Sequence, residues 1–388
     1  MKLLWVCQGV PQLSDGSLLI AYELAKLLSK SHEQDLIFLK SSQEVASPPP
    51  FFGKVIAIPF KGKKDKFSRL KNIFSLRPNL VSYYASGEMK REIYRLTEKQ
   101  RYDIIITLTM NMAQFVSRLP GVRKIILPHD AEHLIYRQIL DRAESGSDKI
   151  KAWLWWKKVC LYQKRVYPCF DSCVVVSERD RLGLVNLSDR IKARVLPSGV
   201  DTGFFKPTGR AGENNIIFTG VMNTWSNVDA VIYFTDNIFP LIEKSFSDIK
   251  FYIVGKKPAA AVKKLGRGNI VVTGEVPDIR PYLEESAVFV APFRIGTGLK
   301  HKILEAMAMG VPVVATPLGA NGLDIEAGKN IMLGGNPEEF ARSIIALLND
   351  KTLRETVVKG AQELVAERYN WDRVGQMMES VLEEVLKN

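Results

Sequence analysis

Short, almost wholly apolar runs alternate with amphipathic stretches along the 388-residue chain. In the first half we predict strands at the opening LLWVC run and at residues 35–39, 55–59, 103–108, 123–127 and 172–176. In the second half we predict five more, at residues 215–220, 250–255, 269–273, 287–291 and 311–316. Strands without polar alternation are typical of parallel sheets that helices cover on both faces. The pattern predicts an α/β chain with two doubly wound sheets.

The segment PSGVDTGFFKP at residues 197–207 is rich in Gly and Pro and is the natural hinge between the halves. We therefore expect one domain over residues 1–200, a second over residues 201–371, and a last helix at residues 372–388. Ligands of open α/β sheets bind beyond the carboxyl ends of the strands. The expected site is a cleft where the carboxyl ends of both sheets face each other.

Composition excludes several classes of protein. Apolar residues make up 46% and charged residues 25%, which is the balance of an ordinary globular chain. No apolar run approaches the roughly 18 residues of a membrane span. Four cysteines without a CxxC pair favour a reducing compartment and no metal site. The start, MKLLWVCQGVPQ, does not resemble a signal peptide, so we expect a cytoplasmic protein.

Positive charge is concentrated in the first half. Residues 1–200 contain 33 Lys and Arg against 19 Asp and Glu, whereas residues 201–388 contain 21 against 23. Such an asymmetry favours a polyanionic partner, either nucleic acid or an anionic membrane surface. Simple solubility is the alternative explanation.

The densest motif is PFRIGTGLKHKILEAMAMG at residues 292–310. Gly296 and Gly298 lie between a predicted strand and a helix predicted to begin at about Leu299, so free backbone N–H groups would face a phosphate there. Three cations, Arg294, Lys300 and Lys302, suit a diphosphate, and Glu305 suits ribose hydroxyls. The alternative is an ordinary glycine loop beside a solvated helix face.

Two common phosphate motifs do not fit. GxGxxG fails because residue 301 is His, and a P-loop fails at Gly328-Lys329 because Asn330 follows. The chain also lacks an Asp-x-Asp sequence, which disfavours a metal-bridged diphosphate. We expect neither a metal nor a cofactor, with the positive charge supplied by side chains and helix ends.

Arg294 to Thr316 follows the pattern RxGxGxKxKxLEAMAxGxPVVAT, which resembles the donor-site motif of one branch of the GT4 retaining glycosyltransferases. Weaker similarities extend over nearly the whole chain. They are PSGVD at residues 197–201, VVVSE at 174–178, FTGVMNTWSN at 218–227 and YNW at 369–371. The resemblance implies a GT-B fold: two Rossmann-like doubly wound domains facing a cleft, with a C-terminal helix that crosses back to the first domain.

The resemblance implies roles for individual residues of the second domain. Glu305 corresponds to the second Glu of the family's E-x7-E pair, on the ribose, whereas Thr297 replaces the first Glu. In the family, cations that bind the diphosphate usually follow the first strand of the donor domain. That loop has no cation in this sequence, so we expect Arg294 and Lys300 to bind the diphosphate instead. Gly220, Gly296, Thr297, Gly298, Leu299 and Lys302 complete the expected donor site.

The first domain offers acceptor-side candidates. Asp15 and Gly16 resemble the remnant of the family's glycine-rich loop, and a plain turn is an equal alternative. His129 follows the predicted strand at residues 123–127 and resembles the family's active-site His beside the transferred sugar. Its alternative is a structural His before a helix capped by Asp130.

The stretch KIKAWLWWKKVCLYQKRVY at residues 149–167 combines three Trp with many basic residues. We favour a helix whose Trp face is buried in the core, with a membrane-surface helix as the functional alternative. Single-stranded nucleic acid would use similar residues.

Together with these features, the resemblance implies a metal-independent retaining glycosyltransferase of polysaccharide biosynthesis. It would move a hexose-type sugar from a nucleoside diphosphate sugar to a glycan or lipid-linked acceptor, with peripheral contact to the inner face of the membrane and no nucleic acid. The alternatives are a GT-B-like sugar-nucleotide epimerase and a non-catalytic nucleic-acid-binding protein that uses the basic half.

Overall fold

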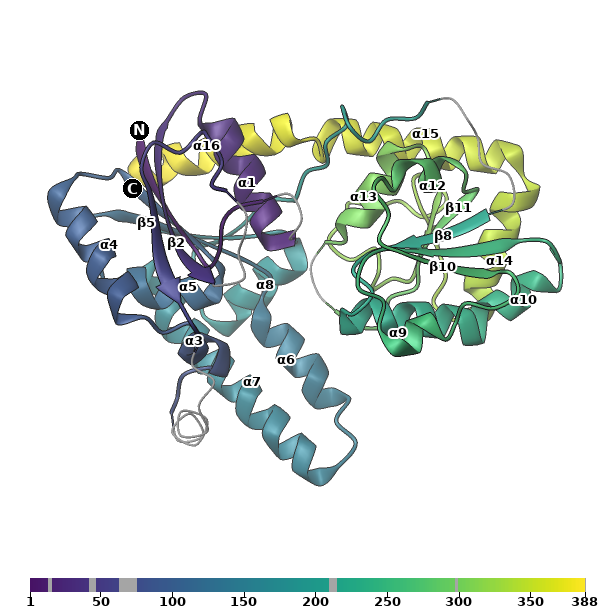
Figure 1. The fold of residues 1–388 in the computed structure, drawn as a ribbon, viewed down its shortest axis with the longest axis horizontal. Helices are drawn as coiled ribbons and strands as arrows, with labels where there is room; N and C mark the ends of the chain where they lie inside the picture. Colours follow the sequence, from purple (N-terminus) through teal and green to yellow (C-terminus); the bar gives the residue numbers. More distant parts are fainter. Residues whose placement is uncertain (13–15, 42–46, 63–74, 209–214, 297–298, 388) are drawn as a thin grey trace. The chain divides into compact units, whose positions relative to one another are not determined.

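The computed structural model describes residues 1–12, 16–41, 47–62, 75–208, 215–296 and 299–387 (Figure 1). The chain separates into two compact units. The first comprises Met1–Pro197 together with Val374–Asn388, and the second comprises Ser198–Arg373. Each unit is a parallel sheet with its own core and covering helices, so the predicted pair of Rossmann-like α/β domains is confirmed.

The sheet of the first unit has the strand order β3-β2-β1-β4-β5-β6-β7. All its neighbouring strands are parallel. The direction of the strand order reverses between β1 and β4, which is the switch point where ligands of such sheets bind. Its strands are β1 (Lys2–Cys7), β2 (Glu33–Ser41), β3 (Val55–Phe60), β4 (Ile104–Leu108), β5 (Arg123–His129), β6 (Ser172–Val175) and β7 (Ala193–Val195).

Capping residues define several helices of the first unit. The hydroxyl of Ser145 accepts from the backbone N–H of Asp148 at the start of α7, and Ser86 does the same for α4. The helices are α1 (Gly16–Leu28), α3 (Asn79–Tyr83), α4 (Gly87–Lys99), α5 (Thr109–Val116), α6 (Glu132–Asp141), α7 (Gly146–Val166), a 3₁₀ turn (Tyr167–Cys169), α8 (Glu178–Leu187) and α16 (Trp371–Lys387). Helix α16 packs on this unit from Val374 onward, where Glu379 contacts His32 at 2.6 Å.

The sheet of the second unit has the order β10-β9-β8-β11-β12-β13, again fully parallel. Its switch point lies between β8 and β11. Its strands are β8 (Asn215–Thr219), β9 (Lys250–Val254), β10 (Ile270–Gly274), β11 (Val288–Ala291), β12 (Val313–Ala315) and β13 (Met332–Leu333).

The helices of the second unit surround a core built from the strands and from a cluster of Phe side chains, including Phe218, Phe234 and Phe251. They are α9 (Trp225–Tyr233), a π-helical turn (Phe234–Ile238), α10 (Phe239–Glu243), α11 (Ala260–Lys263), α12 (Arg280–Glu284), α13 (His301–Ala308), α14 (Pro337–Asn349) and α15 (Lys351–Arg368). Among the described helices, none is long and apolar enough to cross a membrane.

Two local expectations are wrong. Helix α13 begins at His301, two residues after the predicted Leu299, because Lys300 is still extended, with φ −96° and ψ 96°. The Trp face of α7 is not core: Trp153 is 47% exposed and Trp155 41%. The buried side of this helix is formed instead by Ala152, Val159, Tyr162 and Gln163, which follow the helical repeat.

Candidate functional site

The donor-site candidates gather at the switch point of the second sheet. Gly220 directly follows β8, and Arg294 and Gly296 follow β11, its neighbour. Because parallel strands end at the same edge, these two loops lie beside each other and beside the first turn of α13. Leu299 is half-buried against the core of this unit. Thr297 and Gly298 lie outside the described residues.

Lys302 reaches from α13 into the loop after β8. Its ammonium Nζ donates a 2.9 Å hydrogen bond to Oδ1 of Asn227 and lies 4.4 Å from the ring centroid of Phe218. Gly220 has φ 153°, and a Cβ there would collide with the Lys302 Nζ and with the Asn227 amide. The glycine therefore makes room for the half-buried cation.

Glu305 lies one helical turn after Lys302. Burial lowers the pKa of Lys302 to about 7, and burial raises the pKa of Glu305 to about 7 while the neighbouring ammonium opposes that rise. A half-buried pair of opposite charge beside a glycine loop matches the two ends of a nucleotide: an ammonium for phosphate and a carboxylate for ribose hydroxyls. Such strongly shifted groups are frequent at functional sites.

Arg294 is already engaged by a carboxylate. Its guanidinium forms a two-pronged ion pair with Asp229, at 2.6 and 3.1 Å, and stacks 4.3 Å from the ring centroid of Tyr233. Both partners lie on α9. The pair fixes Arg294 at the rim of the site, with 46% of its side chain exposed. Its place is therefore peripheral to the half-buried Lys302.

Lys300 and His301 stand at the start of α13. The Lys300 Nζ lies 5.5 Å from the ring centroid of Phe293. The same Nζ would lie 3.3 Å from a Cβ placed on Gly296, whose φ is 116°. The Nε2 of His301 contacts the Ser198 hydroxyl. Burial lowers the pKa of His301 to about 4, so this imidazole is neutral near pH 7. The contact links the first turn of α13 to the segment that opens this unit.

Sequence reasoning missed Asn227 and Asp229. Each is a polar residue in the first two turns of α9, whose later residues are apolar, and that contrast was the available signal. Asn227 is buried, holds the Lys302 ammonium, and donates a 2.9 Å hydrogen bond to the carbonyl of Val221. Asp229 holds Arg294. Helix α9 thus positions two of the three cations of the predicted donor site, Lys302 and Arg294.

In the first unit, His129 is the last residue of β5. It is 8% exposed and adopts φ 71°, a left-handed conformation that costs a non-Gly residue on the order of 1 kcal/mol. Thr109 adopts φ 66° directly after β4, the neighbouring strand, and its hydroxyl donates to Oε1 of Gln8 after β1 at 3.3 Å. Strained residues at the carboxyl edge of a sheet are a recurrent feature of functional sites.

Thr109 and Gln8 also escaped sequence reasoning, because neither stands out in composition or spacing. Of the predicted acceptor-side loop, Gly16 is the first residue of α1, and Asp15 lies outside the described residues.

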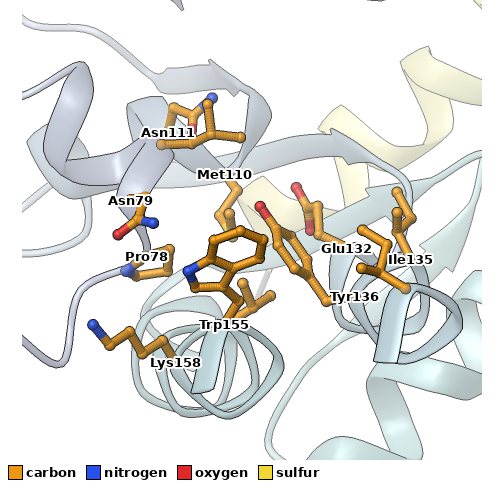
Figure 2. A pocket seen from close by; sticks show the side chains of 12 residues that line it. Pro78, Asn79, Met110, Asn111, Glu132, Ile135, Tyr136, Trp155 and Lys158 are labelled. Carbon is orange, nitrogen blue, oxygen red and sulfur yellow. The ribbon is translucent and has the colours of Figure 1, made fainter. Parts of the chain in front are cut away.

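A pocket of about 410 Å³ lies near this edge in the first unit (Figure 2). Glu132, the first residue of α6, lines it. The Oε2 of Glu132 accepts from Gln163 Nε2 at 2.5 Å and from the Tyr167 hydroxyl at 2.9 Å. Burial raises the pKa of Glu132 to about 8, opposed by the Tyr167 hydrogen bond. A carboxyl in this environment is mostly protonated at pH 7.

Comparison with known proteins finds a family match for a large part of the second unit. Residues 213–350 match the family model described as "Glycosyl transferases group 1". An uncharacterised 44.6 kDa protein from the cps region of Klebsiella pneumoniae is 19% identical over 92% of this chain and 93% of its own length. A phosphatidyl-myo-inositol mannosyltransferase of Mycobacterium leprae is 29% identical, over 38% of this chain and 41% of its own.

Among solved structures, Anabaena HepE in complex with UDP superposes with a TM-score of 0.69 at 16% identity, covering 99% of this chain and 100% of that one. Its similarity extends to both units, whereas the match to the mannosyltransferase spans less than half of that protein. The chain is therefore a glycosyltransferase with the GT-B fold, and residues 213–350 carry its match to the group 1 family.

Proposed function

We propose that the protein transfers a hexose-type sugar from a nucleoside diphosphate sugar to a glycan or lipid-linked acceptor, with retention of anomeric configuration and without a metal ion. The observation that carries the proposal is the half-buried Lys302 and Glu305 pair at the switch point of the second sheet, with Lys302 held by Asn227. The relative whose structure contains UDP supports a nucleoside diphosphate as the common part of the donor.

In this proposal Lys302 and Lys300 bind the diphosphate, together with Arg294 at the rim and with backbone N–H groups of the 296–299 loop. Glu305 accepts hydrogen bonds from the ribose hydroxyls. Positive charge that is already in place when the sugar–phosphate bond breaks stabilises the departing diphosphate, which is where electrostatic catalysis acts most strongly. Lys302 is held in advance by Asn227, so little reorganisation is needed.

The proposed reaction passes through an oxocarbenium-like transition state. The bond from the anomeric carbon to the diphosphate oxygen breaks, the acceptor hydroxyl forms its bond on the same face, and its proton passes to the departing diphosphate. His129 is proposed to lie beside the transferred sugar, with Asp15 and Gly16 on the acceptor side. The segment at residues 197–207 is proposed as the hinge for a closure that excludes water.

We further propose that α7 contacts an anionic membrane. Ile150 is 64% exposed, and Trp153, Leu154 and Trp155 are 39–47% exposed, with Lys151 and Lys157 among them. Aromatic and aliphatic side chains beside lysines are the composition of helices that lie in a membrane interface. The proposed location is the inner face of the cytoplasmic membrane.

The reaction is tested by incubating the protein with UDP-, GDP- and ADP-hexoses and measuring release of the nucleoside diphosphate with membrane extract as acceptor. We expect release from one donor class, with loss of at least about 100-fold in Glu305→Ala. The matched control is Glu355→Ala, which removes an exposed carboxylate of α15 in the same unit. Equal rates in both variants, or no release from any donor, would overturn the proposal.

A further inference from the structure

Two pockets of the first unit follow each other along α7. The first, which we call the apolar pocket, is that of Figure 2 and has a volume of about 410 Å³. The second, the cationic pocket, has a volume of about 460 Å³. Both are lined by α5, by α7 and by the chain at residues 75–80, so they occupy consecutive parts of one groove.

The apolar pocket is walled mainly by hydrocarbon. Most of its lining side chains are apolar, among them Met110, Ile135, Tyr136, Ile139, Trp155 and Val159. Figure 2 shows the Trp155 indole lying across the pocket beside Tyr136, with the Glu132 carboxyl at one side. Trp155 is 41% exposed and Leu80 46%, so two large apolar side chains border an opening to the surface. This lining favours an aliphatic chain over a polar ligand.

The cationic pocket has the opposite chemistry. Arg77, Lys90, Arg118 and Arg165 line it, and none of its described lining residues is acidic. Ser75, Ser117 and Gln114 add neutral hydrogen-bonding groups. Gln114 is fixed in place, because its amide donates to the carbonyls of Val81 and Asn111 at 2.8 Å. Several guanidinium groups around one space are suited to the oxygens of a phosphate.

We propose that the two pockets together bind one amphiphile, with its aliphatic chain in the apolar pocket and its phosphate in the cationic pocket. This rests on the proposed function, because the amphiphile would be a lipid phosphate of the membrane proposed to contact α7. The apolar pocket lies next to the cationic pocket, as the hydrocarbon chain lies next to the phosphate in an alkyl or prenyl phosphate. The exposed Ile150, Trp153 and Leu154 of α7 extend the apolar surface toward the position proposed for the membrane.

The test uses decyl phosphate, kept below its critical micelle concentration, with the full-length protein. Binding is measured by calorimetry and by the change in tryptophan fluorescence. We expect binding at least about tenfold tighter than that of decyl glucoside, which has the same chain and a neutral headgroup. Inorganic phosphate at millimolar concentration should not displace the ligand.

Two variants probe the two pockets separately. Trp155→Gln should weaken decyl phosphate binding at least about tenfold, whereas Trp153→Gln, on the same helix but outside the pocket, should not. The double change Arg118→Glu and Arg165→Glu should abolish the preference for phosphate over glucoside. The control Lys40→Glu and Lys99→Glu makes the same change in net charge at exposed sites outside both pockets.

Several outcomes would overturn the inference: equal affinity for the phosphate and the glucoside, no effect of either pocket variant, or binding only to vesicles of anionic lipid. Stabilisation by UDP, GDP and ADP is measured on the same samples. If one of these nucleoside diphosphates stabilises the protein but decyl phosphate does not bind, the lipid phosphate inference alone fails. If decyl phosphate does not bind and none of the three nucleoside diphosphates does, the proposed function fails as well.

Discussion

The ammonium of Lys302 donates a 2.9 Å hydrogen bond to the side-chain oxygen of Asn227, and this contact joins α13 to α9 across the switch point of the second sheet. It explains three features of the sequence together. Gly220 lacks a side chain because the ammonium occupies that space. Asn227 is a buried polar residue on an apolar helix. The lysine is half-buried, one helical turn before Glu305.

Gly220→Ala should displace Lys302 and weaken nucleoside diphosphate binding. The new Cβ would meet both the Lys302 Nζ and the Asn227 amide at a backbone angle that L-residues rarely adopt. We expect at least about a tenfold loss of affinity in calorimetry, with a stability loss of roughly 1–3 kcal/mol. Gly328→Ala is the matched control, because it also has a positive φ, of 80°, but no atom within 4 Å of its new Cβ. If it reduces affinity equally, the steric explanation is wrong.

The pKa of Lys302 predicts that nucleoside diphosphate affinity falls as the pH rises above 7. Burial lowers this pKa to about 7 in the free protein, and the negative charge of a bound diphosphate raises it. Binding above pH 7 therefore takes up a proton, and the association constant should fall by up to about tenfold per pH unit. The terminal phosphate, with a pKa of about 6, is already ionised in this range.

The measurement is calorimetry between pH 7 and 9, in buffers of different ionisation enthalpy. Lys302→Met should bind weakly and show no slope, whereas Glu305→Gln should keep the slope. An affinity of the unmodified protein that stays constant from pH 7 to 9 would show that Lys302 does not contact the diphosphate.

The strands of both sheets were predictable because buried parallel strands are continuous apolar runs, which are visible without knowledge of their partners. Two short edge strands were not predicted, because two or three residues are too few to show a periodic pattern. They are β7 at Ala193–Val195 and β13 at Met332–Leu333. The exposed Trp153 was mispredicted because three closely spaced tryptophans suggest a core when the partner elements are unknown. Side-chain partners such as Asn227 for Lys302 depend on packing between helices distant in sequence.

Glu132 predicts an unusual dependence of stability on pH in the first unit. Its folded pKa of about 8 lies above the ordinary value of 4.5, so the folded state binds more protons between these pH values. The stabilisation by the protonated carboxyl is complete below about pH 4.5 and is lost as the pH rises through 8. Between pH 5.5 and 8.5 the unmodified protein should lose about 3 kcal/mol more unfolding free energy than Glu132→Gln, since one pKa unit is about 1.4 kcal/mol.

This difference is measured by urea unfolding followed by circular dichroism at both pH values. Glu144→Gln, a change at an exposed position of the same unit, should follow the unmodified protein. If the unfolding free energy changed by the same amount between the two pH values in all three proteins, the Glu132 carboxyl would not be buried in the folded state.

The exposed face of α7 predicts binding to anionic vesicles. Replacing Ile150 and Trp153 with Ser should lower vesicle binding at least about tenfold without loss of stability, because both side chains are exposed in the free protein, at 64% and 47%. Complete burial of an exposed apolar side chain contributes about 1.5–3 kcal/mol, and roughly half of that remains to be gained at each of these two positions. Co-sedimentation with phosphatidylglycerol vesicles at low and high salt measures the effect. Leu182→Ser, at another exposed apolar side chain of this unit, is the control. Undiminished binding of the double variant would exclude α7 as the contact.

The central claim is that the second unit binds a nucleoside diphosphate through Lys302 and Glu305. It is tested most directly by a thermal-shift screen against UDP, GDP, ADP, CMP and NAD, with Glu305→Ala beside the unmodified protein. A ligand that binds only the folded state raises the melting temperature by mass action. The account predicts stabilisation by one nucleoside diphosphate and its loss in Glu305→Ala. A shift that survives Glu305→Ala, or no shift with any diphosphate, would contradict it.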